Sequence, residues 1–132
     1  MTTVLFACVH NAGRSQMAAA LFNLTADPAK ARAISAGTDP GPRVHPEVLT
    51  VMAERGLNLS QVQPVRLTNA LARQAQWLIT MGCGDRCPFI PDAQVEDWPL
   101  DDPKGRPLDE VRAIRDVIAD KVTAFIDAHG WR

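Results

Sequence analysis

Three side chains near the N-terminus, those of Cys8, Arg14 and Ser15, could together bind and attack a tetrahedral oxyanion. A guanidinium can bind two oxygens of such an anion, and backbone N–H groups in a tight loop before a helix can bind others. The helix N-terminus and the nearby cation favour the thiolate form of the cysteine, which is the nucleophile. Ser15 could donate a hydrogen bond to that sulfur. The segment therefore predicts a nucleophile in an anion pocket made by Val9, His10, Asn11, Ala12, Gly13, Arg14 and Ser15.

Two residues inside this segment suit a tightly curled loop. Gly13 relieves the steric constraint on the backbone, and Asn11 tolerates a left-handed conformation and can hydrogen-bond across the loop. The alternative is that Cys8 is a buried thiol at a strand end and Arg14 a surface residue, since this spacing also arises by chance. The position of the segment between an expected strand and an expected helix favours the functional interpretation.

The other two cysteines, Cys83 and Cys87, form a Cys-x3-Cys pair just past another expected strand. Parallel strands end on one edge of their sheet, so Cys83 should lie on the same side of the molecule as Cys8. A structural zinc site usually takes four ligands from two close pairs. Only one such pair is present and the three histidines lack ligand spacing, so no metal is expected. The remaining alternative is that the pair are inert buried thiols.

Apolar patterning predicts the elements that hold these residues. The continuous apolar run Thr3–Cys8 is typical of a strand buried on both faces, and Arg14–Thr25 is typical of a helix. Further strands are expected at 32–36, 76–81 and 94–98, and further helices at 46–55, 68–74 and 108–128. Alternating strands and helices imply an α/β sandwich with a mostly parallel sheet.

Length and composition exclude several classes of protein. A chain of 132 residues that is 46% hydrophobic and 22% charged fits a single globular domain, residues 1–132. The net charge of −1 gives no broad cationic surface for nucleic acid or membranes. No apolar run is long enough to span a bilayer. An odd number of cysteines argues against a secreted disulfide framework, so we expect a cytoplasmic protein with reduced thiols.

Three separated motifs resemble the low-molecular-weight protein tyrosine phosphatases and, more closely, the arsenate reductases that share their fold. The motifs are Cys-x5-Arg-Ser at 8–15 continued by Gln-Met-Ala, Ile-Thr-Met-Gly-Cys at 79–83, and Trp-Pro-Leu-Asp-Asp-Pro at 98–103. The resemblance spans nearly the whole chain. It implies a three-layer sandwich in which helices flank a central four-stranded parallel sheet.

The resemblance to thioredoxin-coupled arsenate reductases also implies a chemistry. Cys8 attacks arsenate, Cys83 attacks Cys8 and releases arsenite, and Cys87 attacks Cys83, which leaves a disulfide that thioredoxin reduces. A carboxylic acid over the pocket would protonate the leaving oxygen. In this family the acid directly precedes a proline, so Asp102 is favoured and Asp101 is second; without the resemblance, these aspartates would be assigned to a solvated turn.

Departures from the family pattern decide between related activities. Tyrosine phosphatases of this fold have aromatic walls after Asp-Pro, whereas Lys104 stands here, and this favours arsenate. Some relatives bind potassium through Asn and Glu side chains; Asn11 matches, but the Glu position falls on Ala19. No cofactor is therefore expected, and potassium is the alternative.

The resemblance leaves both the electron donor and the reaction open. Similar loops occur in relatives that use mycothiol, so a mycothiol- or glutathione-linked reductase is an alternative to the thioredoxin-linked one. The same residues could instead belong to a phosphatase acting on phosphate monoesters, or to a sensor that binds arsenite without turnover. We expect a monomer with no nucleic-acid or membrane partner.

Overall fold

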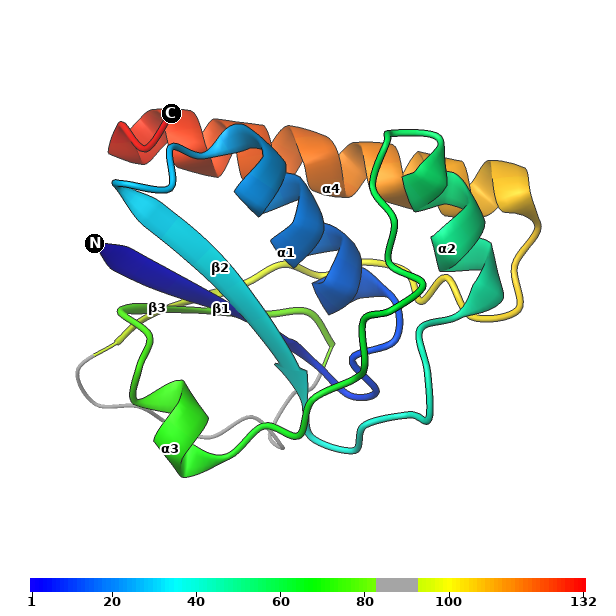
Figure 1. Cartoon of the computed structure of the whole chain (residues 1–132), viewed down its shortest axis with the longest axis horizontal. Coiled ribbons are helices and arrows are strands. Elements are labelled where there is room, and N and C mark those ends of the chain that lie inside the picture. Colours follow the sequence, from blue (N-terminus) through cyan, green and yellow to red (C-terminus); the bar gives the residue numbers. More distant parts are fainter. Residues whose placement is uncertain (83–92) are drawn as a thin grey trace.

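The computed structural model describes residues 1–82 and 93–132. Within these residues, strands and helices alternate along most of the chain (Figure 1). In chain order they are β1 (Thr2–Cys8), α1 (Arg14–Thr25), β2 (Ala31–Gly37), α2 (Pro46–Ala53), α3 (Asn69–Ala72), β3 (Trp77–Thr80), β4 (Gln94–Asp97) and α4 (Leu108–His129).

The described strands form one four-stranded sheet in the order β2-β1-β3-β4, and every neighbouring pair is parallel. Cys8 at the end of β1 pairs with Gly37 at the end of β2. On the other side, Ala7 pairs with Thr80, the last residue of β3. The carboxyl ends of these strands therefore meet at one edge of the sheet, where parallel α/β proteins place their ligand sites.

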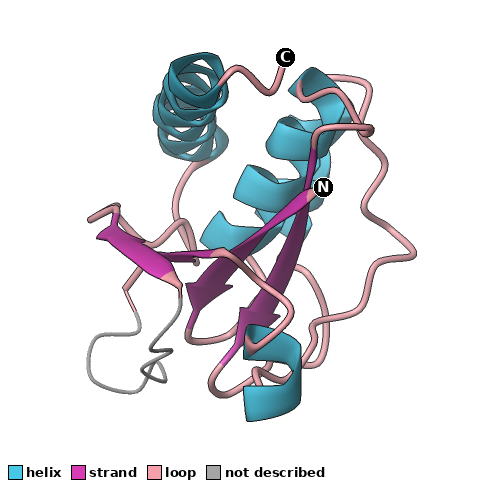
Figure 2. Ribbon diagram, turned by 90° about the vertical axis from the view of Figure 1, so that its left-hand side faces the viewer, coloured by secondary structure: helices cyan, strands magenta, loops and turns pink. Residues whose placement is uncertain are grey.

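Helices cover both faces of the sheet, which confirms the predicted three-layer architecture (Figures 1 and 2). The two faces of β1 illustrate why. Val4 and Phe6 belong to the larger core, with residues of α1, α2 and α4, whereas Leu5 and Ala7 belong to a smaller core with Ala72 of α3. Because β1 is buried on both faces, its sequence is a continuous hydrophobic run, which is the pattern that predicted this strand.

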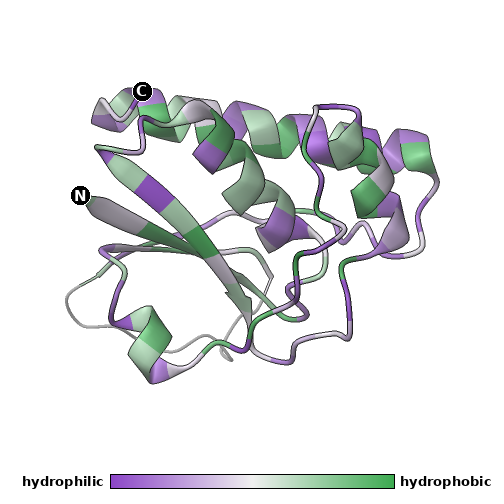
Figure 3. Cartoon of the chain, viewed as in Figure 1, coloured by the Kyte–Doolittle hydropathy of each residue, from purple (hydrophilic) through white to green (hydrophobic). Residues whose placement is uncertain are grey.

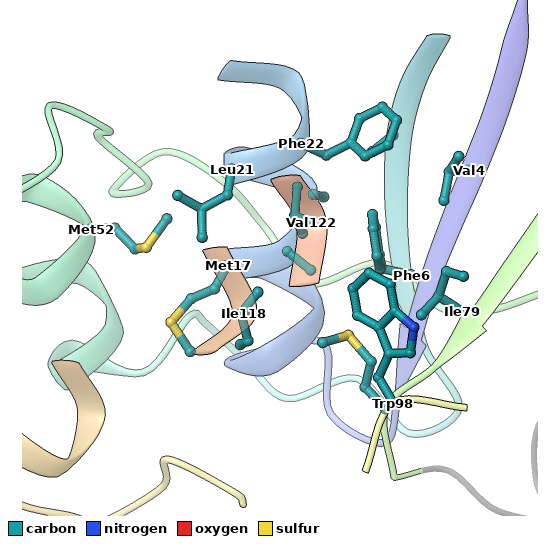
Figure 4. Packing of buried hydrophobic residues seen from close by; sticks show 14 of the residues in the cluster. Val4, Phe6, Met17, Leu21, Phe22, Met52, Ile79, Trp98, Ile118 and Val122 are labelled. Atoms are coloured by element: carbon teal, nitrogen blue, oxygen red, sulfur yellow. The ribbon is translucent and has the colours of Figure 1, made fainter. Parts of the chain in front are cut away.

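The larger core lies between the sheet and the long helices. Figure 4 shows Phe6 and Ile79 of the sheet close to Phe22 of α1 and Val122 of α4. Along α4, buried apolar residues recur three or four positions apart, and hydrophilic residues lie between them (Figure 3). This pattern confirms the predicted amphipathic helix, which packs its apolar stripe against α1 and α2 and places Phe125 against Trp77 of β3. The buried residues of α4 are Val111, Ile114, Arg115, Ile118, Val122, Phe125 and Ile126.

The predicted element boundaries agree closely with the structure. Helix α1 has the expected limits, and Thr68 caps α3 by accepting a hydrogen bond from the Leu71 backbone N–H. Strand β2 is one residue longer at each end than predicted, while β3 is one residue shorter at each end. Among the described residues, no helix combines the length and apolar character needed to cross a bilayer.

Candidate active site

The loop between β1 and α1 holds the Cys8 sulfur in a polar setting although the residue is only 3% exposed. The backbone N–H of Asn11 donates to Cys8 Sγ at 3.2 Å, and Ser15 Oγ lies 2.8 Å from the same sulfur. Asn11 Nδ2 donates to Ser15 Oγ at 2.7 Å, so the serine is held beside the sulfur. The buried sulfur therefore has two polar partners inside the loop, the Asn11 N–H and the Ser15 hydroxyl.

Asn11 organises the inside of this loop. Its φ of 51° is left-handed, a conformation that asparagine tolerates, and its side chain is fully buried. The side-chain oxygen accepts from the Val65 backbone N–H at 2.9 Å and from Gln16 Nε2 at 3.0 Å. Because the side-chain nitrogen holds Ser15, the one residue links the thiol's hydrogen-bond donor to a distant segment of chain.

The outer side of the loop is bound by the segment that follows β2. Four backbone N–H groups of that segment donate to carbonyl oxygens of the loop at 2.8–3.1 Å, which satisfies those carbonyls without water. The loop is therefore fixed both by its own side chains and by a neighbouring stretch of backbone. The donor–acceptor pairs are Thr38 to Cys8, Asp39 to Val9, Gly41 to His10 and His45 to Ala12.

Arg14 brings the predicted acid to the loop. Its guanidinium Nη1 donates to the Leu100 carbonyl at 3.0 Å, and Nη2 lies 3.9 Å from Asp102 Oδ2. The Asp102 side chain is 50% exposed, so it is accessible to a ligand as well as to Arg14. Asp101 instead lines a separate cavity beside Ile114 of α4. The structure therefore brings Asp102 to Arg14, whereas Asp101 faces the other cavity.

The segment that contains Asp102 and Pro103, the acid-bearing segment, packs closely on the loop between β1 and α1, the oxyanion loop. A Cβ placed on Gly13 would lie 2.9 Å from Pro103 Cγ and 3.4 Å from His45 Cδ2, so a side chain there would collide with the proline. Asp102 Oδ1 accepts from the Lys104 backbone N–H at 3.0 Å, which orders the turn. A glycine is therefore needed at position 13 for close packing against Pro103, in addition to the backbone freedom that the sequence suggested.

A cavity of about 420 Å³ opens beside the loop. His10 faces it, with Nδ1 3.0 Å from the Asp39 carbonyl oxygen. Burial lowers the pKa of His45 from its ordinary value; Asp102 and Glu47 raise that pKa, and Lys104 and His10 lower it further. The cavity therefore holds a histidine that is predominantly neutral at pH 7. Its lining residues are His10, Asp39, Pro40, Gly41, Pro42, Arg43, His45, Pro46 and Lys104.

The depressed pKa of His45 makes a contribution to stability that depends on pH. As the pH falls, His45 of the unfolded chain takes up a proton near pH 6.5, whereas His45 of the folded chain does so only at a lower pH. The unfolded state is therefore favoured as the pH falls, and the free energy of unfolding declines. The free energy of unfolding, measured by urea titration, should fall between about pH 7.5 and 5.5 less steeply in His45→Asn than in the parent chain. Equal slopes would contradict this assignment.

The two remaining cysteines, Cys83 and Cys87, lie outside the described residues. The described chain after β3 ends at the expected edge, because the Met81 backbone N–H donates to the Ala7 carbonyl at 2.8 Å, one residue before Cys8. Roles for Cys83 and Cys87 therefore stay predictions from the sequence. No group of three or more potential metal ligands occurs in residues 1–82 and 93–132.

Several residues that shape the site were not identified from the sequence. Val65 binds Asn11 through its backbone N–H and Leu100 binds Arg14 through its carbonyl, and no side-chain pattern predicts such backbone contacts. Gln16 did carry a signal: it is a buried polar residue on a helix face that is otherwise apolar or small, and its side chain bonds Asn11 twice. A buried amide in such a position needs partners, which points back to the loop.

Comparisons with known proteins agree on one family. The family described as low molecular weight phosphotyrosine protein phosphatase matches residues 3–129. A glutaredoxin arsenate reductase of Synechocystis is 33% identical, with 96% of this chain and 97% of the relative covered.

Solved structures of similar proteins have the same fold. The thioredoxin-dependent arsenate reductase of Corynebacterium glutamicum superposes with a TM-score of 0.84 at 38% identity, over 97% of this chain but only 61% of that one. An arsenate reductase in the phosphate binding state superposes with a TM-score of 0.82 at 32% identity, over 97% and 98% of the two chains.

Proposed function

Because this chain belongs to the low molecular weight phosphotyrosine protein phosphatase family, we propose that it reduces arsenate to arsenite through a relay of Cys8, Cys83 and Cys87. Its relatives from Synechocystis and Corynebacterium glutamicum are arsenate reductases by name. The chain is accordingly an arsenate reductase of this family. What is proposed is the relay, the residues that carry it and the electron donor.

One observation carries the proposal: the buried Cys8 sulfur accepts from the Asn11 N–H and lies 2.8 Å from Ser15 Oγ, in the loop that leads to Arg14 and its partner Asp102. Cys8 ends β1 and Arg14 begins α1, so one loop joins a sulfur nucleophile to a cation that can bind anionic oxygens. Asp102, which is half exposed and lies 3.9 Å from Arg14 Nη2, is the proposed donor of a proton to the oxygen that leaves. These three groups suit attack on a tetrahedral oxyanion such as arsenate.

The proposed steps balance in atoms and electrons. The Cys8 thiolate forms a sulfur–arsenic bond, and one arsenate oxygen leaves as water with a proton from Asp102. The Cys83 thiolate then attacks Cys8 Sγ, and the electron pair of the sulfur–arsenic bond goes to arsenic, which is reduced from the +5 to the +3 state and leaves as arsenite. Cys87 attacks Cys83, frees Cys8 and leaves a Cys83–Cys87 disulfide.

The disulfide must be reduced by two electrons from an external dithiol, and we propose thioredoxin as its source. The Corynebacterium relative is named for thioredoxin and the Synechocystis relative for glutaredoxin, so both donors occur among similar proteins. Measurement of arsenite production with thioredoxin and its reductase, against glutaredoxin with glutathione and against mycothiol, would identify the donor. Faster turnover with glutaredoxin or with mycothiol would overturn the choice of thioredoxin.

The relay itself is tested by replacing its second thiol. In Cys83→Ser, arsenite formation coupled to thioredoxin should stop. Without the Cys83 sulfur, no thiolate of this pair attacks Cys8 to release arsenite, and no disulfide forms for thioredoxin to reduce. Phosphate should bind as in the parent chain, since the oxyanion loop is intact. The measurement is arsenite released per chain, followed by rapid quench.

Cys87→Ser is the matched control, because it removes the third thiol and leaves the second. It should release about one arsenite per chain in a single burst and then stop at a Cys8–Cys83 disulfide. Undiminished multiple turnover by Cys83→Ser would overturn the relay. Hydrolysis of an aryl phosphate that far exceeds arsenate reduction, and is unchanged in both variants, would instead favour a phosphatase.

A further inference from the structure

Gly82 lies directly against the guanidinium of Arg14. A Cβ built on Gly82 would be 2.6 Å from Arg14 Nη1, 3.2 Å from Cζ and 3.3 Å from Nη2. All three distances are shorter than ordinary van der Waals contact, and they involve three of the four heavy atoms of the guanidinium. A side chain at this position would therefore occupy space that the guanidinium now fills.

The guanidinium has little room to move away from such a side chain without losing its partners. Its Nη1 donates to the Leu100 carbonyl at 3.0 Å, and its Nη2 lies 3.9 Å from Asp102 Oδ2. The Arg14 side chain is only 14% exposed. Gly82 thus forms a backbone surface on which the guanidinium rests while the acid-bearing segment holds its nitrogen atoms.

The backbone at Gly82 is itself held in place. The preceding residue, Met81, donates its backbone N–H to the Ala7 carbonyl at 2.8 Å, and Trp98 donates to the carbonyl of Thr80 at 2.8 Å. The φ of Gly82 is +103°, a conformation that residues with a Cβ rarely adopt. Neither the chain before Gly82 nor its own dihedral angle leaves an easy way to accommodate a larger residue.

We propose that Gly82 is a positioning residue for oxyanion binding: its bare backbone sets where the Arg14 guanidinium lies at the mouth of the loop. A side chain there turns the guanidinium out of its present place, so the enzyme binds arsenate and phosphate more weakly. The proposal rests on the assignment of Arg14 to oxyanion binding, but not on the thiol relay. It also explains why a glycine immediately precedes Cys83, since the chain passes across Arg14 at that point.

The direct test is the affinity of Gly82→Ala for inorganic phosphate, measured by calorimetry on the reduced protein. Displacement of a binding group by about 1 Å can weaken function by about a hundredfold, so we expect the dissociation constant to rise by about tenfold to a hundredfold. The KM for arsenate should rise with it. Phosphate affinity within about twofold of the parent chain would overturn the proposal.

Gly56→Ala controls for backbone strain. Gly56 has a φ of +75°, but no atom lies within 4 Å of the Cβ built on it. This variant should lose stability in a urea titration without losing phosphate affinity, because it carries left-handed strain and no collision. An equal loss of affinity in both variants would show that strain alone is responsible, and would overturn the role given to Gly82.

A double-mutant cycle with Arg14→Lys separates positioning from general damage. Lysine lacks the planar guanidinium, so adding Gly82→Ala to Arg14→Lys should change phosphate affinity by less than about twofold. A full additional loss would overturn the proposal. If Gly82→Ala alone does not fold, Arg14→Ala in the same chain should restore folding by removing the colliding side chain, and a double variant that still does not fold would count against it.

Discussion

Replacing Cys8 by serine should lower kcat/KM for arsenate reduction by about 10⁴-fold or more, because a nucleophile that acts with its neighbours as a unit cannot be replaced by a weaker one. The serine hydroxyl is uncharged at neutral pH and cannot be oxidised to a disulfide. Phosphate should nevertheless bind, since the backbone N–H groups of the loop and the Arg14 guanidinium are unchanged. Arsenite release and phosphate calorimetry measure the two effects.

Ser15→Ala provides a graded comparison. Ser15 Oγ lies 2.8 Å from Cys8 Sγ, and the variant removes this contact while the thiol remains. The loss of activity, measured as arsenite release, should be smaller than in Cys8→Ser, because the attacking sulfur is still present. Substantial multiple turnover by Cys8→Ser would show that another group attacks arsenate.

Replacing Asp102 by asparagine should lower kcat by about 10²- to 10⁴-fold, the usual contribution of a general acid. Asparagine has the same shape but holds no proton that it can give to a leaving oxygen. The carboxylate is also 3.9 Å from Arg14 Nη2, so its removal frees the cation and should not weaken phosphate binding. Rapid-quench measurement of the first turnover isolates this step from reduction by the donor.

Asp101→Asn is the matched control for that prediction, since it makes the same chemical change one residue earlier. Asp101 lines the cavity beside α4 rather than the oxyanion loop. Its replacement should leave kcat within about twofold of the parent value. The reverse pattern, with Asp101→Asn inactive and Asp102→Asn active, would move the role of the acid to Asp101.

The fold could be predicted from the sequence because its signals are local and strong. The unbroken apolar run of β1 requires burial on both faces, and the three- to fourfold spacing in α4 requires a helix with one buried side. Gly130 ends α4 with a left-handed φ of 70°, in agreement with the predicted stop. The limits of β2 and β3 were predicted less accurately than those of α1, because pairing with neighbouring strands, rather than residue type, decides where a strand ends.

The candidate site was predictable only where side chains carry the interactions. The left-handed Asn11 and its bond to Ser15 follow from residue type, because few residues combine that backbone tolerance with a short amide. The partners of Arg14 did not follow. A carbonyl at Leu100 and a bare backbone at Gly82 make contacts across the fold that depend on tertiary structure, so no local pattern could indicate them.

The four backbone hydrogen bonds between the oxyanion loop and the segment after β2 have a consequence for binding energetics. Ordering a loop costs conformational entropy, and a loop that closed only around its ligand would lose that much affinity. Here the loop is ordered when the chain folds, so the anion meets a preorganised pocket. The same coupling works in reverse: a bound anion should raise the melting temperature of the whole protein, because the anion binds the ordered loop, which exists only in the folded chain.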